Sequence, residues 1–289
     1  MRGRTDLAAE QAGRLGERLP RGIKVEEKQW GLVTVLRVRV TDQPAAELLG
    51  KPVGSYYTIE GRSLEQGVDD NPDRTAAAAR VLKGLLPQQG TVLVVGLGNR
   101  EMTPDALGPM VADQVLATRH LEENLRAASR LRETAVLAPG VLPQTGLEVA
   151  EQVGWAVREM KPAAVVVVDA LAAAEPGRLG RTIQIADSGI TPGSGVMGNH
   201  LPLDRERLGV PVISVGIPMV IDAETFVDDY LRQVGVEEEV IESRKNCPML
   251  VAPHDADLVV RRGAGCIALA LNMALQPGLS EAEIRVLSE

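Results

Sequence analysis

Three aspartates of this chain follow apolar stretches, at positions where chemistry could take place. Asp105 comes one loop after TVLVVGL, Asp169 closes AAVVVVD, and Asp187 closes TIQIAD. Open parallel sheets bind ligands beyond the carboxyl ends of their strands, so carboxylates from two strands can meet there. Two close carboxylates share a proton, which lets one act as base and the other as acid. Such a pair can activate water against an amide without a metal ion.

Each aspartate also has a structural interpretation. Thr103, Pro104 and Asp105 suit a helix start, where a carboxylate accepts hydrogen bonds from backbone amides. Asp169 follows four valines, and burying its carboxylate would be costly without a partner. Asp187 opens DSG, the tripeptide of pepsin-like proteases, but those folds are all-β and this chain has helical stretches. On the residues alone, capping is the favoured interpretation of Asp105. Asp105 and Asp169 are the candidate pair, with Asp187 as the alternative to Asp169.

A glycine-rich stretch follows Asp187 and is a candidate for binding substrate. Its supporting residues would be Ser188, Gly189, Gly193 and Ser194. The backbone amides of such a loop could cradle a ligand, although a long surface loop with positive φ angles has the same composition. Ser194 lacks the flanking glycines of a nucleophile elbow.

Signatures of cofactors and metals are weak. GLGNRE carries Glu101 where a dinucleotide fingerprint needs its third glycine. His120, His200 and His254 lack metal-binding spacing. We therefore expect no cofactor and no metal, and the one metal site worth considering is a carboxylate pair with a single histidine at the strand ends.

Composition narrows the partners. The chain has 289 residues, 45% hydrophobic and only 2% aromatic, and a formal net charge of -8, which argues against a broad basic face for nucleic acid or anionic lipid. The N-terminus lacks an apolar signal region, and Asp169 interrupts the longest apolar run. Cys247 and Cys266 form no CxxC pair, which is typical of a reducing compartment. We expect a cytoplasmic protein with no direct nucleic-acid or membrane partner.

The elements that must position the aspartates alternate in type. TVLVVGL, TAVLA and AAVVVVDAL are predicted strands, separated by predicted helices DALGPMVADQVLATRH and GLEVAEQVGWAVREM. Continuous Val and Leu runs without polar alternation are typical of parallel strands covered on both faces. RTIQIAD and VPVISVGIP add two strands, and AETFVDDYLRQV and ADLVVRRGAGCIALALNMAL add two helices. The pattern predicts a three-layer, doubly wound, mostly parallel α/β sheet with helices on both faces.

The first third of the chain is more peripheral. Residues 1–30 are polar and irregular and are expected to form an arm or a peripheral element, whereas LVTVLRVRV and YYTIE predict a small N-terminal β element. DRTAAAARVLKGLL predicts a helix that ends before Pro87. We expect one catalytic domain over residues 7–289, with peripheral strands and a helix in 7–90 and the core sheet and C-terminal helices in 91–289.

Five ordered stretches carry a resemblance: GLGNREMTPDALGP, PGVLPQTGLE, VVVVDALAA, TIQIADSGITPGSGVMGN and VPVISVGIPMVIDA. Together they resemble the germination proteases of endospore-forming bacteria. The resemblance implies an endopeptidase that degrades small acid-soluble spore proteins in the spore core, forms a homotetramer, and has a fold similar to the hydrogenase maturation proteases. Asp105 and Asp169 match the two aspartates proposed as catalytic in that family.

The N-terminal stretch RTDLAAE resembles the substrate site of that family. The resemblance implies a zymogen that cuts itself between Asp6 and Leu7 and releases residues 1–6 as a short propeptide. On the residues alone, Thr5 or Asp6 capping a helix, with Glu10 following, is the favoured alternative.

Substrates that contain Glu predict basic groups near the cleft, for which Arg178 and Arg181 are candidates. A nickel-type maturation protease with the same two carboxylates, or a non-catalytic binding homologue, are the alternative functions.

Overall fold

A computed structural model describes residues 4–16, 18–66, 72–193, 200–236 and 249–288. Its described strands form one sheet in the order β1-β2-β3-β7-β8-β6-β4-β5, with β9 beside β8. The strands are β1 Ile23–Trp30, β2 Val33–Val40, β3 Gly54–Glu60, β4 Val92–Gly96, β5 Thr134–Leu137, β6 Ala164–Ala173, β7 Thr182–Ala186, β8 Val212–Asp222 and β9 Leu250–Val251. The helices are α1 Ala8–Gly13, α2 Gln43–Leu49, α3 Pro72–Leu85, α4 Leu107–Ala112, α5 Glu123–Ala128, α6 Leu142–Thr145, α7 Val149–Met160, α8 Arg205–Leu208, α9 Ala223–Gln233, α11 Ala256–Leu275 and α12 Glu281–Ser288.

Four neighbouring strands, β8, β6, β4 and β5, run parallel. Their sequences are nearly continuous runs of Val, Ile and Leu, and almost all of these side chains are buried. Both faces of this region are covered by helices, so neither face of a strand needs polar residues. The α/β sheet with helices on both faces is confirmed.

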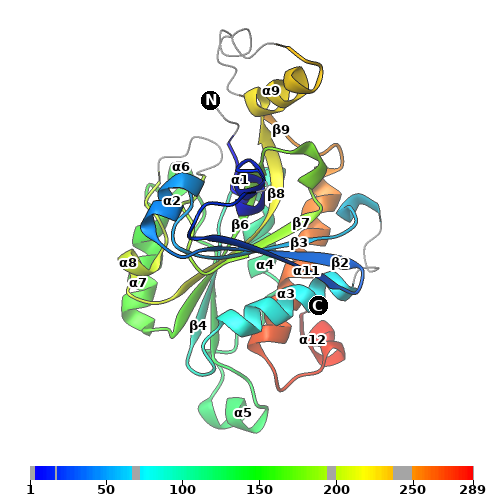
Figure 1. Cartoon of the computed structure of the whole chain (residues 1–289). Coiled ribbons are helices and arrows are strands. Elements are labelled where there is room, and N and C mark those ends of the chain that lie inside the picture. Colours follow the sequence, from blue (N-terminus) through cyan, green and yellow to red (C-terminus); the bar gives the residue numbers. More distant parts are fainter. Residues whose placement is uncertain (1–3, 17, 67–71, 194–199, 237–248, 289) are drawn as a thin grey trace.

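Helices cover the two faces of the sheet separately (Figure 1). On one face α3, α4 and α11 pack over the centre of the sheet and form the largest apolar core. On the other face, α7 and α8 form a second core with β4 and β6, while α1 and α2 cover the N-terminal strands. The molecule therefore has three layers, with the sheet in the middle.

The N-terminal β element joins the main sheet as an antiparallel extension. β2 pairs with both β1 and β3, and β3 pairs with β7. The pairing of LVTVLRVRV with YYTIE is confirmed. Residues 1–30 are peripheral as expected, but they are not irregular throughout. Residues 23–30 form β1, an edge strand whose charged side chains lie mostly exposed, as edge strands require to resist further pairing.

The helix predicted over residues 105–120 is shorter than expected. Asp105 lies in a 3-10 turn, Thr103–Asp105, and α4 ends at Ala112. Beyond α4, the buried Asn272 of α11 accepts a hydrogen bond from the amide of Leu116 and donates one to the carbonyl of Gln114. This side chain supplies the backbone partners that a longer helix would have provided, so the chain can turn away.

The apolar helix α11 is the centre of the larger core. It is long and apolar enough to cross a membrane, and among the described residues it is the one helix of that kind. Its residues from Val259 to Leu275 pack against α3 and α4, which is the arrangement of a core helix.

Candidate active site

Asp105 is held just beyond the end of β4. The backbones of β4 and α4 touch, since a Cβ built on Gly108 would lie 2.2 Å from the carbonyl oxygen of Leu97 and 2.5 Å from that of Val168. The amide of Asn99, in the turn after β4, donates a 2.6 Å hydrogen bond to a carboxylate oxygen of Asp105. No side chain caps α4, so Asp105 does not have the capping role that its sequence suggested.

Asp169 lies inside β6 rather than at its end. The strand was expected to close at this residue, but it continues to Ala173 because β8 pairs with it along that length. The Asp169 residue is only 6% exposed, and its carboxylate accepts a 2.9 Å hydrogen bond from the amide of Ala170. Its carboxylate is thus largely removed from water within the sheet.

The two aspartates open into one cavity at the carboxyl ends of the parallel strands. The cavity has a volume of about 680 Å³, and Asp6, Asp105 and Asp169 all line it, together with His200 and Gly193. Apolar walls come from the turn after β4, from the start of α6 and from β9: Leu97, Met102, Pro104, Val141, Leu142, Pro143 and Leu250. Sequence reasoning placed Asp105 and Asp169 together, and the structure does so too.

Burial and mutual repulsion shift the titration of this pair. Desolvation raises the pKa of Asp169 well above its ordinary value, and the nearby charges of Asp105 and Asp6 raise it further. Desolvation also raises the pKa of Asp105, which the Asn99 amide partly offsets. Two carboxyl groups in this arrangement retain a proton between them more readily than in water, and Asp169 is the better place for it.

The N-terminal segment 5–10 is bound beside this cavity. The amide of Asp6 donates to the carbonyl of Ala172 in β6, and the amide of Ala172 donates to the Asp6 carboxylate, both at 2.8 Å. Leu7 is fully buried in an apolar cluster with Leu171, Ala173 and Ile221. Helix α1 begins directly afterwards, at Ala8. A helix is therefore present as predicted, but its N-cap is Leu7, which makes no side-chain capping hydrogen bond, rather than Thr5 or Asp6. Asp6 itself lines the cavity of the two aspartates.

Glu10 holds the C-terminal end of segment 5–10 against the backbone that follows β6. Its carboxylate accepts hydrogen bonds from the amides of Ala174 and Glu175, at 2.9 and 3.0 Å, and from the hydroxyl of Thr5. Arg178 lies 3.5 Å from it. Burial raises the pKa of Glu10, and these hydrogen bonds offset part of that rise.

Arg178 and Arg181 do not line the cavity that holds the two aspartates. Arg178 forms ion pairs with Glu10, Glu60 and Glu175, while Arg181 is exposed. Arg178 nevertheless pairs with Glu10 of the N-terminal segment, the stretch that resembles the substrate site of the family. A role of Arg178 and Arg181 in binding substrate stays a prediction.

Replacing Arg178 by methionine (Arg178→Met) should loosen segment 5–10. We expect a loss of about 2 kcal/mol in the free energy of unfolding, because the buried Glu10 loses its cationic partner. The loss is limited because Arg178 is partly exposed, so that solvent already weakens the ion pair. Urea unfolding measures the loss in stability, and amide exchange in α1 measures the loosening of the segment. The matched control is Arg181→Met, on the exposed side chain, and equal effects of the two changes would contradict this role.

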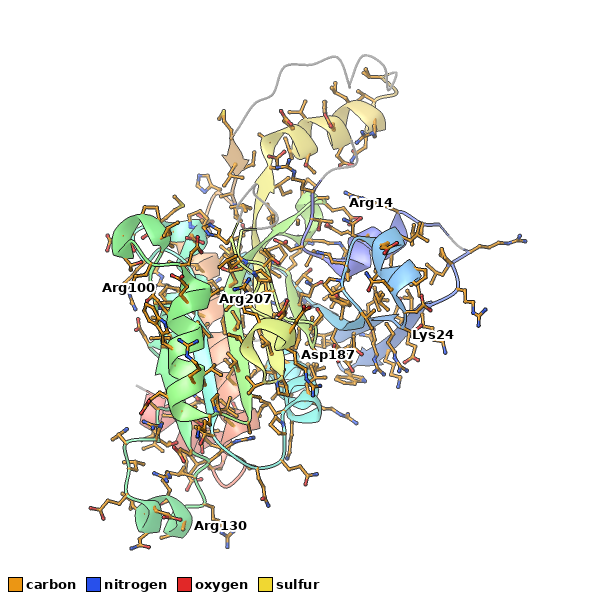
Figure 2. The ribbon with its side chains drawn as sticks, turned by 90° about the vertical axis from the view of Figure 1, so that its left-hand side faces the viewer. Arg14, Lys24, Arg100, Arg130, Asp187 and Arg207 are labelled. Atoms are coloured by element: carbon orange, nitrogen blue, oxygen red, sulfur yellow. The ribbon has the colours of Figure 1, made fainter. Side chains whose placement is uncertain are left out.

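The other residues predicted for the site are spread out. Asp187 accepts a 2.7 Å hydrogen bond from the amide of Ser55 and does not line the cavity. β7 runs antiparallel to β8, so the carboxyl end of β7 lies at the opposite edge from that of β6. Figure 2 shows Asp187 toward the side that carries Lys24 of β1, whereas Arg100, after the β4 turn, lies on the other side. Asp187 is therefore not the partner of Asp105.

The glycine-rich stretch divides between two cavities. Gly193 lines the cavity of the aspartates, whereas Ser188 and Gly189 line a smaller neighbouring one. Ser194 lies outside the described residues. His200, one of the three histidines without metal-binding spacing in the sequence, lines the aspartate cavity and lies 3.5 Å from Glu148. Within the described part of the chain no three His, Cys, Asp or Glu side chains are close enough to hold a metal ion.

Comparison with known proteins identifies the family of the chain. A family model described as germination protease matches residues 5–237, so the chain is a protease. A germination protease of Caldanaerobacter subterraneus is 37% identical over 98% of this chain and 97% of its own. One of Clostridium perfringens is 33% identical over 96% of each chain, and one of Bacillus velezensis is 39% identical over 78% of this chain and 65% of its own. The chain belongs to the germination protease family.

Among solved structures, a [NiFe] hydrogenase maturation protease from Thermococcus kodakarensis is similar. It is 22% identical, with a TM-score of 0.37, over 66% of this chain and 98% of its own.

Proposed function

We propose that this protease uses Asp105 and Asp169 to activate water, cuts itself between Asp6 and Leu7, and then degrades small acid-soluble spore proteins at germination. The observation that carries the proposal is the position of Asp6, which lines the same cavity as both aspartates. An acidic residue of the chain thus already occupies the place where a protein substrate would lie. The spore core as its compartment and a homotetramer as its assembly remain predictions.

The two carboxyl groups are given different roles by their surroundings. Asp169, the more deeply buried, holds the shared proton, because its pKa is raised the more strongly. Asp105 is ionised, since the Asn99 amide stabilises its negative charge. Asp105 then takes a proton from water as the water oxygen attacks the carbonyl carbon, and Asp169 gives its proton to the departing nitrogen.

Incubation of the full chain tests this proposal. Mass spectrometry should detect loss of residues 1–6 and cleavage of a peptide carrying residues 1–14, MRGRTDLAAEQAGR, between Asp6 and Leu7. Cleavage only at other bonds would contradict the assignment of Asp6 to the site. Binding of the peptide without any cleavage would instead identify a non-catalytic homologue.

A metal-dependent variant of this chemistry has one observation in its favour, His200 in the cavity with both aspartates. Elemental analysis of the purified protein and cleavage in the presence of a chelator distinguish the two mechanisms. We expect cleavage to continue at the same rate in chelator. Loss of activity that returns on addition of nickel or zinc would assign the aspartates to a metal site instead.

A further inference from the structure

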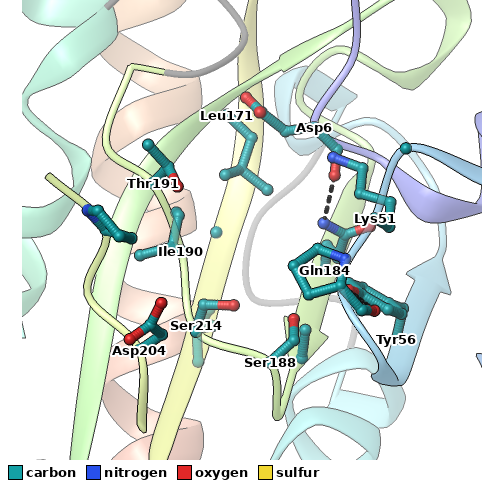
Figure 3. A pocket seen from close by; sticks show the side chains of 17 residues that line it. Asp6, Lys51, Tyr56, Leu171, Gln184, Ser188, Ile190, Thr191, Asp204 and Ser214 are labelled. Carbon is teal, nitrogen blue, oxygen red and sulfur yellow. Dashed lines mark hydrogen bonds between the residues drawn. The ribbon is translucent and has the colours of Figure 1, made fainter. Parts of the chain in front are cut away.

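Gln184 holds the peptide bond between Asp6 and Leu7 from the side opposite the aspartates' cavity. Its side-chain nitrogen Nε2 donates a 2.7 Å hydrogen bond to the carbonyl oxygen of Asp6. Its oxygen Oε1 accepts a 2.9 Å hydrogen bond from the amide of Ala8. Figure 3 shows the Gln184 side chain reaching Asp6, with Lys51 beside it. The two contacts fix the amide in one orientation and hold the chain on both sides of Leu7.

The sheet register brings Gln184 and Asp169 to the same face. Gly216 of β8 is paired with Asp169 of β6 on one side and with Gln184 of β7 on the other. Paired residues of neighbouring strands point to the same face, and strands lie about 4.8 Å apart, so these two Cα atoms are roughly 10 Å apart. Gly216 between them carries no side chain, and a Cβ there would meet the carbonyl oxygen of Asp169 at 2.4 Å. The side chain of Leu171 fills the space over Gly216, since its Cγ would lie 2.6 Å from that Cβ. Leu7 packs in the same apolar cluster as Leu171, so the N-terminal segment lies over this row of residues.

Asp6 borders two cavities across this row. One is the cavity of about 680 Å³ that contains Asp105 and Asp169. The other, of about 200 Å³, is lined by Gln184, Lys51, Tyr56 and Gly216 (Figure 3). Asp6 thus has carboxyl groups on one side and an amide donor on its carbonyl oxygen on the other. This is the arrangement needed to attack a carbonyl carbon while a donor holds its oxygen.

We propose that Gln184 is a catalytic residue that stabilises the oxyanion formed at the carbonyl of Asp6. This inference rests on the proposed cut between Asp6 and Leu7. When water attacks the carbonyl carbon, one water proton passes to Asp105 and the π electrons of the carbonyl move onto its oxygen. The Nε2–H of Gln184 bonds to that oxygen. The electron pair on the oxygen then re-forms the C=O bond as the C–N bond breaks, and the nitrogen of Leu7 takes the proton of Asp169.

Lys51 acts on the preceding carbonyl. Its ammonium group donates a 3.2 Å hydrogen bond to the carbonyl oxygen of Thr5. Burial lowers the pKa of Lys51, while the charges of Asp6 and Glu10 act in the opposite direction. Lys51 is a positioning residue that holds the backbone at Thr5, one residue before Asp6. The donor to the reacting oxygen is Gln184.

The test compares Gln184→Glu with wild type in the full chain. Glutamate keeps the length of the side chain and the acceptor for the Ala8 amide but loses the Nε2–H donor. Self-cleavage is a first-order process without a binding step, so its rate constant reports the chemistry. We expect it to fall on the order of 10² to 10³-fold, the usual cost of losing one oxyanion donor, while amide exchange at Ala8 stays slow.

A matched control is Gln276→Met. Gln276 is also a buried glutamine that hydrogen-bonds backbone, at Arg132, but it lies at the end of α11 and does not line the cavity. It should lower stability and leave the rate constant unchanged. If wild type cleaves and Gln184→Glu cleaves equally fast, or if Gln276→Met is slowed equally, the role of Gln184 is overturned. If wild type itself does not cut after Asp6, the proposed function fails first.

Discussion

Replacing Asp169 by asparagine (Asp169→Asn) is expected to abolish cleavage and at the same time make the protein more stable above neutral pH. Asparagine fits the space of the carboxyl group but cannot give a proton to the departing nitrogen. Removing one member of a catalytic unit costs roughly 10⁴-fold or more in rate. The first-order self-cleavage rate and hydrolysis of the 1–14 peptide measure this loss.

The gain in stability follows from the raised pKa of Asp169. Its folded pKa lies above the unfolded value of about 3.9, so folding favours the protonated carboxyl. The stability from this group is complete below the unfolded pKa and is lost as the pH rises through the folded one. Asparagine is neutral throughout, so the melting temperature should exceed that of wild type by on the order of 2 °C or more near pH 8. The difference should shrink toward about pH 4.

The control for this prediction is Asp187→Asn, since that exposed aspartate lies at the other edge of the sheet. It should cleave at the wild-type rate and show no gain at high pH. Cleavage by Asp169→Asn at the wild-type rate, with a raised melting temperature, would make Asp169 a structural residue only.

A second large effect is expected when Gly108 is replaced by alanine (Gly108→Ala). The new methyl group would lie within 2.5 Å of three backbone atoms, the nitrogen and oxygen of Leu97 and the oxygen of Val168. The backbone at Leu97, just after β4, and at Val168 in β6 cannot rotate away as a side chain can, so α4 must move off the sheet. We expect a loss of about 3 kcal/mol or more in the free energy of unfolding, at the upper end of the cost of overpacking.

The same shift should slow cleavage, because Asp105 directly precedes α4 and moves with it. Gly84→Ala is the matched control: Gly84 lies in helix α3, and a Cβ there meets nothing within 4 Å. It should raise stability slightly, by up to about 1 kcal/mol. Urea unfolding of both variants measures the difference, and a neutral Gly108→Ala would show that the contact between α4 and the sheet is loose.

The sequence contained enough to predict the parallel centre of the sheet and the meeting of two aspartates. The runs VLVVG and AVVVVDALAA have no polar alternation, which only strands buried on both faces tolerate. Asp105 and Asp169 each follow such a run, so the general rule for α/β sheets was sufficient to bring them together.

That rule could not predict the direction of β7 or the presence of the edge strand β1. Asp187 also follows an apolar strand, but β7 is antiparallel to its neighbour, and nothing local in TIQIA indicates direction. Half of the residues of β1 are charged, because an edge strand is selected to be polar, and in the sequence it therefore resembles a loop.

Gln184 did leave a signal that was missed. It stands between Ile183 and Ile185, which point into the larger core, so a period of two puts Gln184 on the opposite face. A buried polar residue between two isoleucines needs a hydrogen-bonding partner. That partner, the backbone around Asp6, is 178 residues away and could be identified only from the fold.

The long separation between the N-terminal segment and its binding partners has a consequence for synthesis. Asp6 is among the first residues made, but its contacts with Ala172 and Gln184 span 166 and 178 residues. At about 5–20 residues per second, this part of the sheet emerges roughly 10–35 s later. Until β6, β7 and β8 are paired, the bond before Leu7 has neither carboxylates nor amide donor beside it. Under the proposed mechanism, a chain that has cut itself is therefore one whose central sheet has already folded.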